Sequence, residues 1–333
     1  MKRVLVTGGA GYIGSHTAWQ LVAAGHEVVV LDDLSSGHRW AAPTQAAFVR
    51  GDVADRALLH RILDAHRINA VIHFAAHVVV PESVAAPAKY YRNNVVGSLN
   101  LIESCIAADV GALVFSSSAA VYGAPDGASD AGIKEDAATA PINPYGASKL
   151  ITEWTLRDLA AAASGFRFVA LRYFNVAGAR LDGALGQATP RATHLIKAAC
   201  EAACGARDGL RIFGDDYPTA DGTCVRDYIH VEDLARAHLA AFDYLDRGGD
   251  SIALNCGYGR GHSVAEVVAC VKAVSGSDFA VAVEDRRAGD PPALVADNAL
   301  IREHLQWQPQ HDDLAVICDS AYRWERTLMQ RRG

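Results

Sequence analysis

Short runs of β-branched and other apolar residues alternate with longer helical patterns through the first half of the chain. The runs predict six strands, which cover Lys2 to Thr7, Glu27 to Leu31, Ala47 to Arg50, Ala70 to Phe74, Ala112 to Ser116 and Phe168 to Tyr173. Apolar residues at helical spacing predict helices between them, including Arg56 to His66 and a long segment from Ser83 to Ala108. Right-handed crossovers place such helices on both faces of one parallel sheet. We therefore predict an α/β fold with a doubly wound parallel sheet of the Rossmann type.

The pattern changes after residue 177, where loops become more frequent, at 179–188 and 214–222. Helices are predicted in this part over 191–204, 263–275 and 312–329. The segments 226–244 and 251–255 could pack back against the domain formed by the first half of the chain. We therefore expect a first domain over 1–177, with returns from about 226–256, and a smaller mixed α/β domain over 178–333.

With 50% hydrophobic and 21% charged residues, the composition is that of a globular protein rather than a disordered one. A net charge of −7 gives no general attraction to phosphate backbones, so we expect no nucleic acid partner, and a bound anion must be held by local positive charge. The apolar run after Arg3 is too short for a signal peptide, and no run of about 18 apolar residues predicts a membrane span. Seven cysteines without a CxxC pair favour reduced thiols in the cytoplasm and no metal site.

A glycine-rich segment follows the first predicted strand and opens the first helix. It satisfies the spacing GxGxxG at Gly9, Gly11 and Gly14, and the spacing GxxGxxG when it is counted from Gly8. Glycines there allow a tight turn and let a pyrophosphate approach the backbone, while the helix N-terminus supplies unpaired N–H groups. The segment therefore predicts a dinucleotide site, against the alternative of a glycine-rich turn without a ligand.

Acidic residues downstream of this segment indicate which dinucleotide binds. Asp32 ends the second strand, 18 residues after Gly14, where a carboxylate can accept hydrogen bonds from both hydroxyls of adenosine ribose and would repel a 2′-phosphate. This favours NAD over NADP, although Asp33 competes for the role and Arg39 lies nearby. Asp52, after the third strand, is either an adenine contact or a loop cap.

Tyr145 and Lys149 stand four residues apart on a segment whose Pro144 suits a helix start, so they share one helix face. To act as a base near neutrality, the pKa of a phenol must fall from about 10 by roughly three, which corresponds to about 4 kcal/mol. One positive charge about 5 Å away contributes on the order of 3 kcal/mol before desolvation is subtracted. Lysine alone barely suffices, and we expect the positive charge of bound NAD⁺ to help.

The fifth predicted strand ends in three serines, Ser116 to Ser118, at the carboxyl edge where ligands of such sheets bind. Ser118 could hydrogen-bond a substrate hydroxyl and relay its proton to Tyr145. The alternative is a serine that caps the end of the strand. Nucleophilic catalysis is disfavoured because no GxSxG sequence surrounds these serines.

Six sequence segments together resemble the extended short-chain dehydrogenase/reductase family, and within it the enzymes that epimerise UDP-hexoses. They are TGGAGYIGSH from residue 7, VIHFAA from 71, FSSSAAVYG from 115, NPYGASK from 143, LRYFN from 171 and GTCVRDYIHVEDL from 222. The resemblance implies a tightly held NAD, a homodimer, and reversible inversion at C4 of UDP-glucose and UDP-galactose through a 4-keto intermediate. Tyr145 would take the 4-hydroxyl proton with help from Ser118, and residues 178–333 would bind the UDP-sugar.

The resemblance also implies which residues line the two ligands. Those of the cofactor would be Gly8, Gly11, Tyr12, Ile13, Gly14, Asp32, Asp52, Val53, Phe74, Ala75, Ala76, Asn94, Ser116, Tyr145, Lys149 and Tyr173. Those of the substrate would be Ser118, Tyr145, Asn175, His194, Phe213, Arg226, Arg287, Asp290 and Leu294. Asn94 could instead cap a helix turn, Tyr173 could fill the core, and each arginine could form a surface salt bridge.

Three positions depart from the family pattern. Val78 stands where many relatives carry a lysine that contacts the cofactor, and His194 replaces a frequent asparagine, either to donate to phosphate or only to occupy a helix surface. Leu294 stands where a bulky tyrosine restricts some relatives to sugars without an N-acetyl group. Because leucine is smaller, we hypothesise that UDP-N-acetylglucosamine and UDP-N-acetylgalactosamine are also accepted.

Two other functions share much of this pattern. A nucleotide-sugar 4,6-dehydratase would need an Asp-Glu pair after Ser118, where this chain has Ala119-Ala120. A non-catalytic NAD-sensing protein is disfavoured by the intact Ser118, Tyr145 and Lys149. The sequence leaves open whether the preferred substrate is a hexose, an N-acetylhexosamine, a pentose or a uronate.

Overall fold

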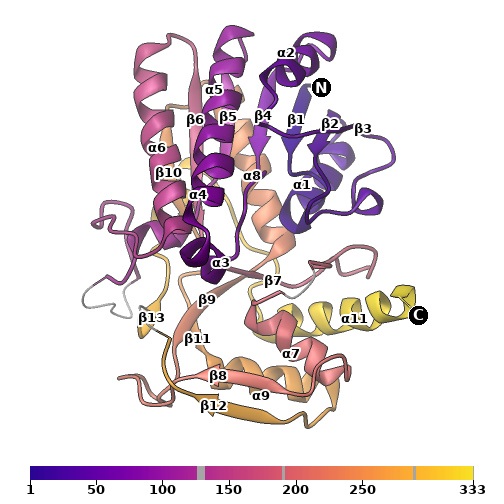
Figure 1. Ribbon diagram of the computed structural model, residues 1–333, viewed down its shortest axis with the longest axis vertical. Helices are drawn as coiled ribbons and strands as arrows, with labels where there is room; N and C mark the ends of the chain where they lie inside the picture. The colour runs from indigo at the N-terminus through magenta and orange to yellow at the C-terminus, as the bar shows by residue number, and fades with distance from the viewer. Residues whose placement is uncertain (126–131, 190–191, 288–289, 333) are drawn as a thin grey trace.

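The computed structural model describes residues 1–125, 132–189, 192–287 and 290–332. Its largest sheet, in the upper part of Figure 1, has seven parallel strands in the order β10-β6-β5-β4-β1-β2-β3. They are β1 (Arg3–Thr7), β2 (Glu27–Asp32), β3 (Ala47–Arg50), β4 (Ala70–His73), β5 (Ala112–Ser116), β6 (Arg167–Tyr173) and β10 (Ile252–Cys256). The six predicted strands are confirmed, and β10 pairs with β6 at one edge.

Helices cover both faces of this sheet, as the alternating side chains of β1 require. Val4 and Val6 pack in one core with α1 (Tyr12–Ala23), α8 (Val231–Asp246) and α10 (Ala299–Leu305). Leu5 packs in a second core with α2 (Arg56–Ala65), α5 (Gly97–Ala107) and α6 (Pro144–Ala162). The doubly wound fold is therefore confirmed. Its strand order changes direction between β1 and β4, which is where such sheets form a ligand crevice.

The segment from Ser83 to Ala108 is not the single helical stretch that its pattern predicts. It contains the second half of α3 (Val80–Ala85), then α4 (Pro87–Tyr90), the π-helical turn η2 (Tyr91–Val96) and α5. Pro87 explains the first break, since proline lacks an N–H and keeps the preceding residue out of helical conformation. Ala86 accordingly has φ −136° and ψ 60°.

The second part of the chain lies below the main sheet in Figure 1 and contains two small sheets. One sheet joins β7 (Asn175–Ala177), β9 (Val225–His230), β11 (Gly261–Ser263) and β13 (Ala293–Leu294), and the other pairs β8 (Leu210–Phe213) with β12 (Val281–Glu284). The predicted helices are α7 (Leu195–Ala203), α9 (Val264–Ser275) and α11 (Leu314–Arg332). Residue 191 lies outside the described residues, and α7 begins only at Leu195 because His194 has extended backbone angles. The short 3₁₀ helices are η1 (Arg39–Ala41) and η3 (Ala119–Tyr122).

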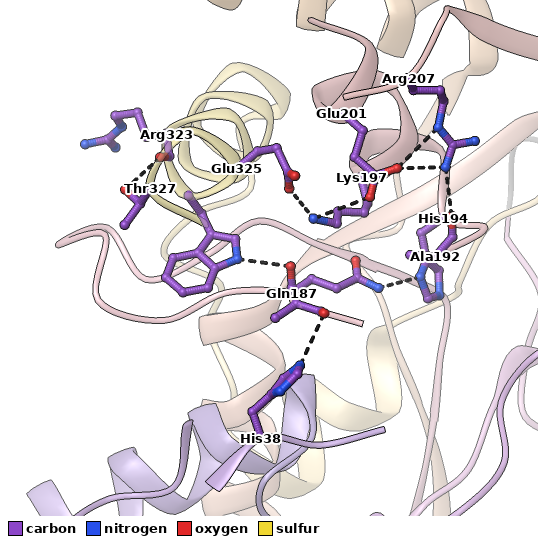
Figure 2. Close-up of polar contacts among 12 residues, drawn as sticks. His38, Gln187, Ala192, His194, Lys197, Glu201, Arg207, Arg323, Glu325 and Thr327 are labelled. Carbon is purple, nitrogen blue, oxygen red and sulfur yellow. Dashed lines mark hydrogen bonds and ion pairs between the residues drawn. The ribbon is translucent and has the colours of Figure 1, made fainter. Parts of the chain in front are cut away.

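A buried ion pair joins two helices of this second part. In Figure 2, Lys197 of α7 points toward Glu325 of α11, and these side chains are 5% and 1% exposed. Glu201 lies 3.6 Å from Lys197 and is also held by Arg207 at 2.7 Å. Within the described ranges, no helix is long and apolar enough to cross a membrane.

We predict that Lys197→Met lowers the free energy of unfolding by about 3 kcal/mol, because it leaves Glu325 buried without a counter-charge. The double variant Lys197→Met/Glu325→Leu should recover most of that loss, since Glu201 keeps Arg207 as its partner. Urea denaturation followed by circular dichroism measures both. Equal losses in the single and double variants would contradict this interpretation.

Candidate active site

The glycine segment forms a tight cradle at the carboxyl end of β1. Gly8 has φ +69°, and a Cβ there would lie 2.7 Å from the Ala75 nitrogen, while a Cβ on Gly14 would lie 2.3 Å from the Gly8 carbonyl oxygen. The helix α1 begins at Tyr12 without a side-chain cap, so the first N–H groups of its turn, at Tyr12 and Ile13, remain for an anion. The cradle therefore fits a dinucleotide pyrophosphate.

Asp32 lies beside the cradle, as the sequence predicts. Its carboxylate is buried and accepts hydrogen bonds from the backbone N–H groups of Ala10, at 2.9 Å, and Leu34, at 2.8 Å. Burial raises the pKa of Asp32, and these hydrogen bonds oppose the rise. Asp33 is exposed and bonds to Ser35, so Asp32 is the better placed of the two for a ribose.

The other residues predicted around the adenosine are less specific. The guanidinium of Arg39 lies 4.4 Å from the centre of the Phe48 ring. Asp52 is exposed and accepts a hydrogen bond from the Ala54 N–H, so it caps the loop, which is one of the two roles considered for it. The neighbouring Val53 is buried. An adenine contact by Asp52 stays a prediction.

Hydrogen bonds run from β1 to Asn94 beneath the glycine cradle. Thr7 Oγ1 lies 2.7 Å from His73 Nδ1, and His73 Nε2 lies 2.8 Å from Ser98 Oγ, which donates to the Asn94 carbonyl. Because Ser98 donates onward, His73 donates from Nε2 and accepts from Thr7 at Nδ1. Burial lowers the pKa of His73 to about 3, in agreement with a neutral ring. These bonds fix β1 and β4 on either side of the crevice.

The side chain of Asn94 makes its hydrogen bonds within the protein. Its amide oxygen accepts from the His77 N–H and from Asn93, and its amide nitrogen donates to the His77 carbonyl and to Ser148. It thereby holds the turn after Phe74, Ala75 and Ala76, which are half-buried at the end of β4. A direct contact of Asn94 with the cofactor stays a prediction, and Val78 in the same turn is exposed.

Ser118, Tyr145 and Lys149 meet at the carboxyl end of β5. The helix α6 begins at Pro144, after Asn143 caps the Gly146 N–H at 2.9 Å, and it places Tyr145 and Lys149 in buried positions on one face. Lys149 Nζ donates to the Ser116 carbonyl at 2.7 Å and lies 5.9 Å from the centre of the Tyr145 ring.

Burial works against charge on both members of this pair. It raises the pKa of Tyr145, and a hydrogen bond from Ser118 only partly opposes that effect. Burial also lowers the pKa of Lys149 to about 7, against the opposing charge of Glu153. The phenol therefore remains protonated at neutral pH unless a further positive charge comes close, as the sequence-based arithmetic predicts.

Ser116 and Tyr173, both predicted beside the cofactor, contact each other. The Ser116 hydroxyl lies 2.5 Å from the Tyr173 hydroxyl, and both side chains are buried. Tyr173 also packs in the core between the main sheet and α8. Tyr173 therefore fills the core and also contacts Ser116, while its contact with the cofactor stays a prediction.

Most of the predicted substrate residues gather on the small sheets. Asn175 begins β7, which pairs with β9, and Leu294 of β13 is the register partner of Arg226 on β9. Arg226 Nη2 lies 3.6 Å from Asp290 Oδ1. At the end of β8, the Phe213 ring lies 3.7 Å below the guanidinium of Arg287.

His194 and Asn175 both line one small pocket between α7 and β7. The His194 side chain is exposed, and its Nδ1 accepts a hydrogen bond from Gln187 at 2.8 Å, as Figure 2 shows. Gln187 thus orients the ring, and donation from His194 to a phosphate stays a prediction.

Sequence reasoning missed a group of buried polar residues behind Ser118 and Lys149. Glu153 and Arg172 form a bidentate ion pair, and Ser117 hydrogen-bonds to Glu153 at 2.5 Å. The spacing of four residues between Lys149 and Glu153 could have revealed Glu153. Nothing in the sequence pairs it with Arg172.

A second group of titratable residues lies away from these residues. His230, Glu232 and His311 bring potential metal-ligand atoms within 4.8 Å of one another. However, His230 Nδ1 accepts from the Glu232 N–H at 3.1 Å and its Nε2 lies 3.2 Å from Ser320 Oγ, so both ring nitrogens already have partners. His230 thereby caps the N-terminus of α8, since its side chain accepts the Glu232 N–H in the first turn.

Comparison with known proteins gives a consistent result. A model of the NAD dependent epimerase/dehydratase family matches residues 4–257. The chain is 57% identical to a UDP-glucose 4-epimerase of Azospirillum brasilense, over 99% of this chain and 94% of that protein. The structure of UDP-glucose 4-epimerase from Brucella ovis in complex with NAD is 49% identical, with a TM-score of 0.93 over 97% of this chain and 98% of that chain.

A further structure, the UDP-Glc/GlcNAc 4-epimerase from Campylobacter jejuni, is 48% identical, with a TM-score of 0.86 over 98% of this chain and 100% of that chain. The family model and the relatives cover the glycine cradle, Ser118, Tyr145 and Lys149 in a single alignment range. This chain therefore belongs to the NAD dependent epimerase/dehydratase family.

Proposed function

We propose that this protein catalyses the reversible, NAD-dependent epimerisation of UDP-glucose and UDP-galactose at C4, through a 4-keto intermediate. The observation that carries the proposal is the meeting of Ser118, Tyr145 and Lys149 at the carboxyl end of β5, in the sheet that also holds the glycine cradle and Asp32. Relatives named as UDP-glucose 4-epimerases match nearly the whole chain.

The residues of the crevice would hold NAD through backbone and carboxylate groups. The glycine cradle, with Gly8, Gly11 and the first N–H groups of α1, suits the pyrophosphate, and Asp32 suits the adenosine ribose. When bound, oxidised NAD supplies a hydride acceptor and a positive charge. Phe74, Ala75, Ala76, Ser116 and Tyr173 would line the nicotinamide end.

Tyr145 acts as the base in this proposal and Ser118 as the relay. The Ser118 hydroxyl, which acts to lower the pKa of the Tyr145 phenol, takes a proton from the sugar 4-hydroxyl as it gives its own to Tyr145. Lys149, held by the Ser116 carbonyl, stabilises the phenolate that receives this proton. The inversion would be complete, without net oxidation, once the hydride has returned to the opposite face of C4 and Tyr145 has returned the proton to the 4-keto oxygen through Ser118.

The small sheets would hold the UDP part of the substrate. Arg226 and Arg287 supply the local positive charge that an anionic ligand needs on a chain of net charge −7. Phe213 offers an aromatic face for the base, while Asp290 and Asn175 offer acceptors and donors for ribose and diphosphate. His194, oriented by Gln187, has Nε2 left for a phosphate oxygen. We assign residues 1–177, with the segment from about 226–256, to the NAD-binding domain and the remainder to the UDP-sugar-binding domain. Asn175 and Arg226 stand at the boundary and contribute to the UDP site.

We further propose a homodimer in the cytoplasm. Exposed apolar side chains gather on the helices that cover one face of the sheet, with Val84 63% exposed on α3, Val96 50% exposed at the end of η2 and Trp154 46% exposed on α6. Such a face suits a second copy of the chain. The seven cysteines are unpaired thiols, which suits a reducing compartment.

The activity is tested by incubating purified protein with UDP-galactose, without added NAD, and identifying the product by NMR. We expect UDP-glucose from the wild type, and Tyr145→Phe should lower turnover by about a thousandfold with little change in substrate affinity, because the variant lacks only the reacting oxygen. A 4-keto-6-deoxy sugar would instead indicate a dehydratase. Unchanged substrate would indicate a binding protein.

Leu294 tests the range of sugars accepted. It packs against the apolar cluster that contains residues of η3, which follows Ser118. We expect the wild type to epimerise UDP-N-acetylglucosamine, and Leu294→Tyr to lower that turnover on the order of tenfold or more while sparing UDP-galactose. Leu294→Met, which nearly conserves volume, is the matched control. If the wild type does not convert the acetylated sugar, the idea is rejected.

Trp154→Arg should convert the proposed dimer to a monomer in sedimentation velocity experiments, because a charge would be buried without a partner at the interface. Trp40 on η1 is also 46% exposed, so Trp40→Arg is a control of equal exposure away from this face. A wild-type monomer, or a dimer that survives the Trp154 substitution, would contradict the proposed interface.

A further inference from the structure

A buried polar network lies directly behind the residues of the proposed reaction. Glu153 follows Lys149 by one turn of α6, and its carboxylate accepts hydrogen bonds from Ser117 Oγ at 2.5 Å and from Arg172 at 3.0 Å and 2.7 Å. The Glu153 and Arg172 side chains are only 7% and 9% exposed. A buried ion pair of this kind does not by itself stabilise a fold better than apolar residues would.

Arg172 closes the network on the side away from Lys149. Its Nη1 donates to the Tyr122 hydroxyl at 2.9 Å and to the Glu135 carbonyl at 3.0 Å. The Tyr122 hydroxyl donates in turn to Asn255 Oδ1 at 2.7 Å, on β10. The arginine is thus held by η3, by the loop at Glu135 and by the edge of the main sheet, and it cannot follow a movement of Glu153 freely.

Two consecutive residues of the strand end are held by two consecutive turns of α6. Lys149 Nζ binds the Ser116 carbonyl at 2.7 Å, and Glu153 binds the Ser117 hydroxyl. Ser118 is the next residue, and its extended backbone, with φ −158° and ψ 147°, carries its hydroxyl to Tyr145. A displacement of Ser117 would therefore be transmitted to Ser118 through one peptide bond.

Glu153 is also the negative charge that acts on Lys149. The titratable groups facing Lys149 are Tyr145 and Glu153 from α6 and His73 from β4, and His73 is neutral. From β6, Tyr173 is bound to Ser116, and Arg172 is neutralised by Glu153 itself. The charge of Glu153 raises the pKa of Lys149 against the larger effect of burial.

We infer that Glu153 is a positioning residue for the epimerase reaction: through Ser117 it fixes the strand end that carries Ser118, and through its charge it keeps Lys149 protonated. The inference rests on the proposed function, because it assigns these two effects to the acid-base step at Tyr145. It predicts that the two effects can be separated by substitution.

The sign of the charge effect follows from the role of Lys149. Only the charged ammonium stabilises the Tyr145 phenolate, so turnover falls as pH rises through the pKa of Lys149. Burial has already lowered that pKa to about 7. Removing the Glu153 charge lowers it further, and the alkaline limb of the pH profile of kcat moves to lower pH. Ser117→Ala keeps every charge and should lower kcat without moving this limb.

The experiment measures kcat and KM for UDP-galactose against pH in the wild type, Glu153→Gln, Glu153→Asp and Ser117→Ala. We expect Glu153→Gln to move the alkaline limb down by on the order of one pH unit. Glu153→Asp, which retains the charge, should leave the limb near its wild-type position but lower kcat, as Ser117→Ala does. Asp158→Asn is the matched control, because Asp158 lies on the same helix but is exposed.

If Glu153→Gln does not fold, Glu153→Gln/Arg172→Met removes both buried charges. Because a positive charge is lost together with the negative one, the alkaline limb should then move in the same direction but by less. Ser117→Ala, a smaller change, tests the positional effect independently. A limb that stays in place in the folded glutamine variant would overturn the charge effect, and an unchanged kcat in Ser117→Ala would overturn the positional effect. An inactive wild type would instead contradict the proposed function.

Discussion

The central constraint of this structure is that a lysine and a phenol lie side by side in buried positions, while the proposed reaction requires the lysine to stay charged. Burial raises the pKa of Tyr145 and lowers that of Lys149, so it disfavours the charge that each residue needs for catalysis. The protein offsets this cost locally. Lys149 has the Ser116 carbonyl and the field of Glu153, while Tyr145 has the Ser118 hydroxyl.

The doubly wound sheet makes this arrangement possible because it brings strand ends and helix starts together at one edge. Lys149 reaches the end of β5 because α6 begins beside it, and α6 begins there because Asn143 and Pro144 fix its first turn. The cofactor cradle belongs to the same edge, since β1 and β4 lie on either side of the crevice. The sheet thus sets the distance between the cradle and Tyr145, which act on one sugar carbon in the proposed reaction.

Much of this could be predicted from the sequence, because it depends on local patterns. Alternation of apolar runs predicts the six central strands, and a spacing of four residues predicts that Tyr145 and Lys149 share a face. What could not be predicted depends on register between distant segments. Arg172 meets Glu153 only because β6 lies next to β5 beneath α6. The break at Pro87 was visible in the sequence, but the π turn that follows it has no such signal.

The three positions that depart from the family pattern differ from the buried network in how strongly a substitution would affect the proposed proton transfer. Val78 and His194 are exposed and Leu294 is half-buried at the end of a short strand, so we expect substitutions there to alter the proposed ligand contacts without changing the charges around Tyr145. The network of Ser117, Glu153 and Arg172 is buried, and each member has a hydrogen-bond partner within the network. A change in one member leaves a charge or donor without a partner close to the reacting hydroxyls. In the proposed reaction, the range of substrates can therefore vary through the more exposed residues, while the proton transfer depends on the buried network remaining intact.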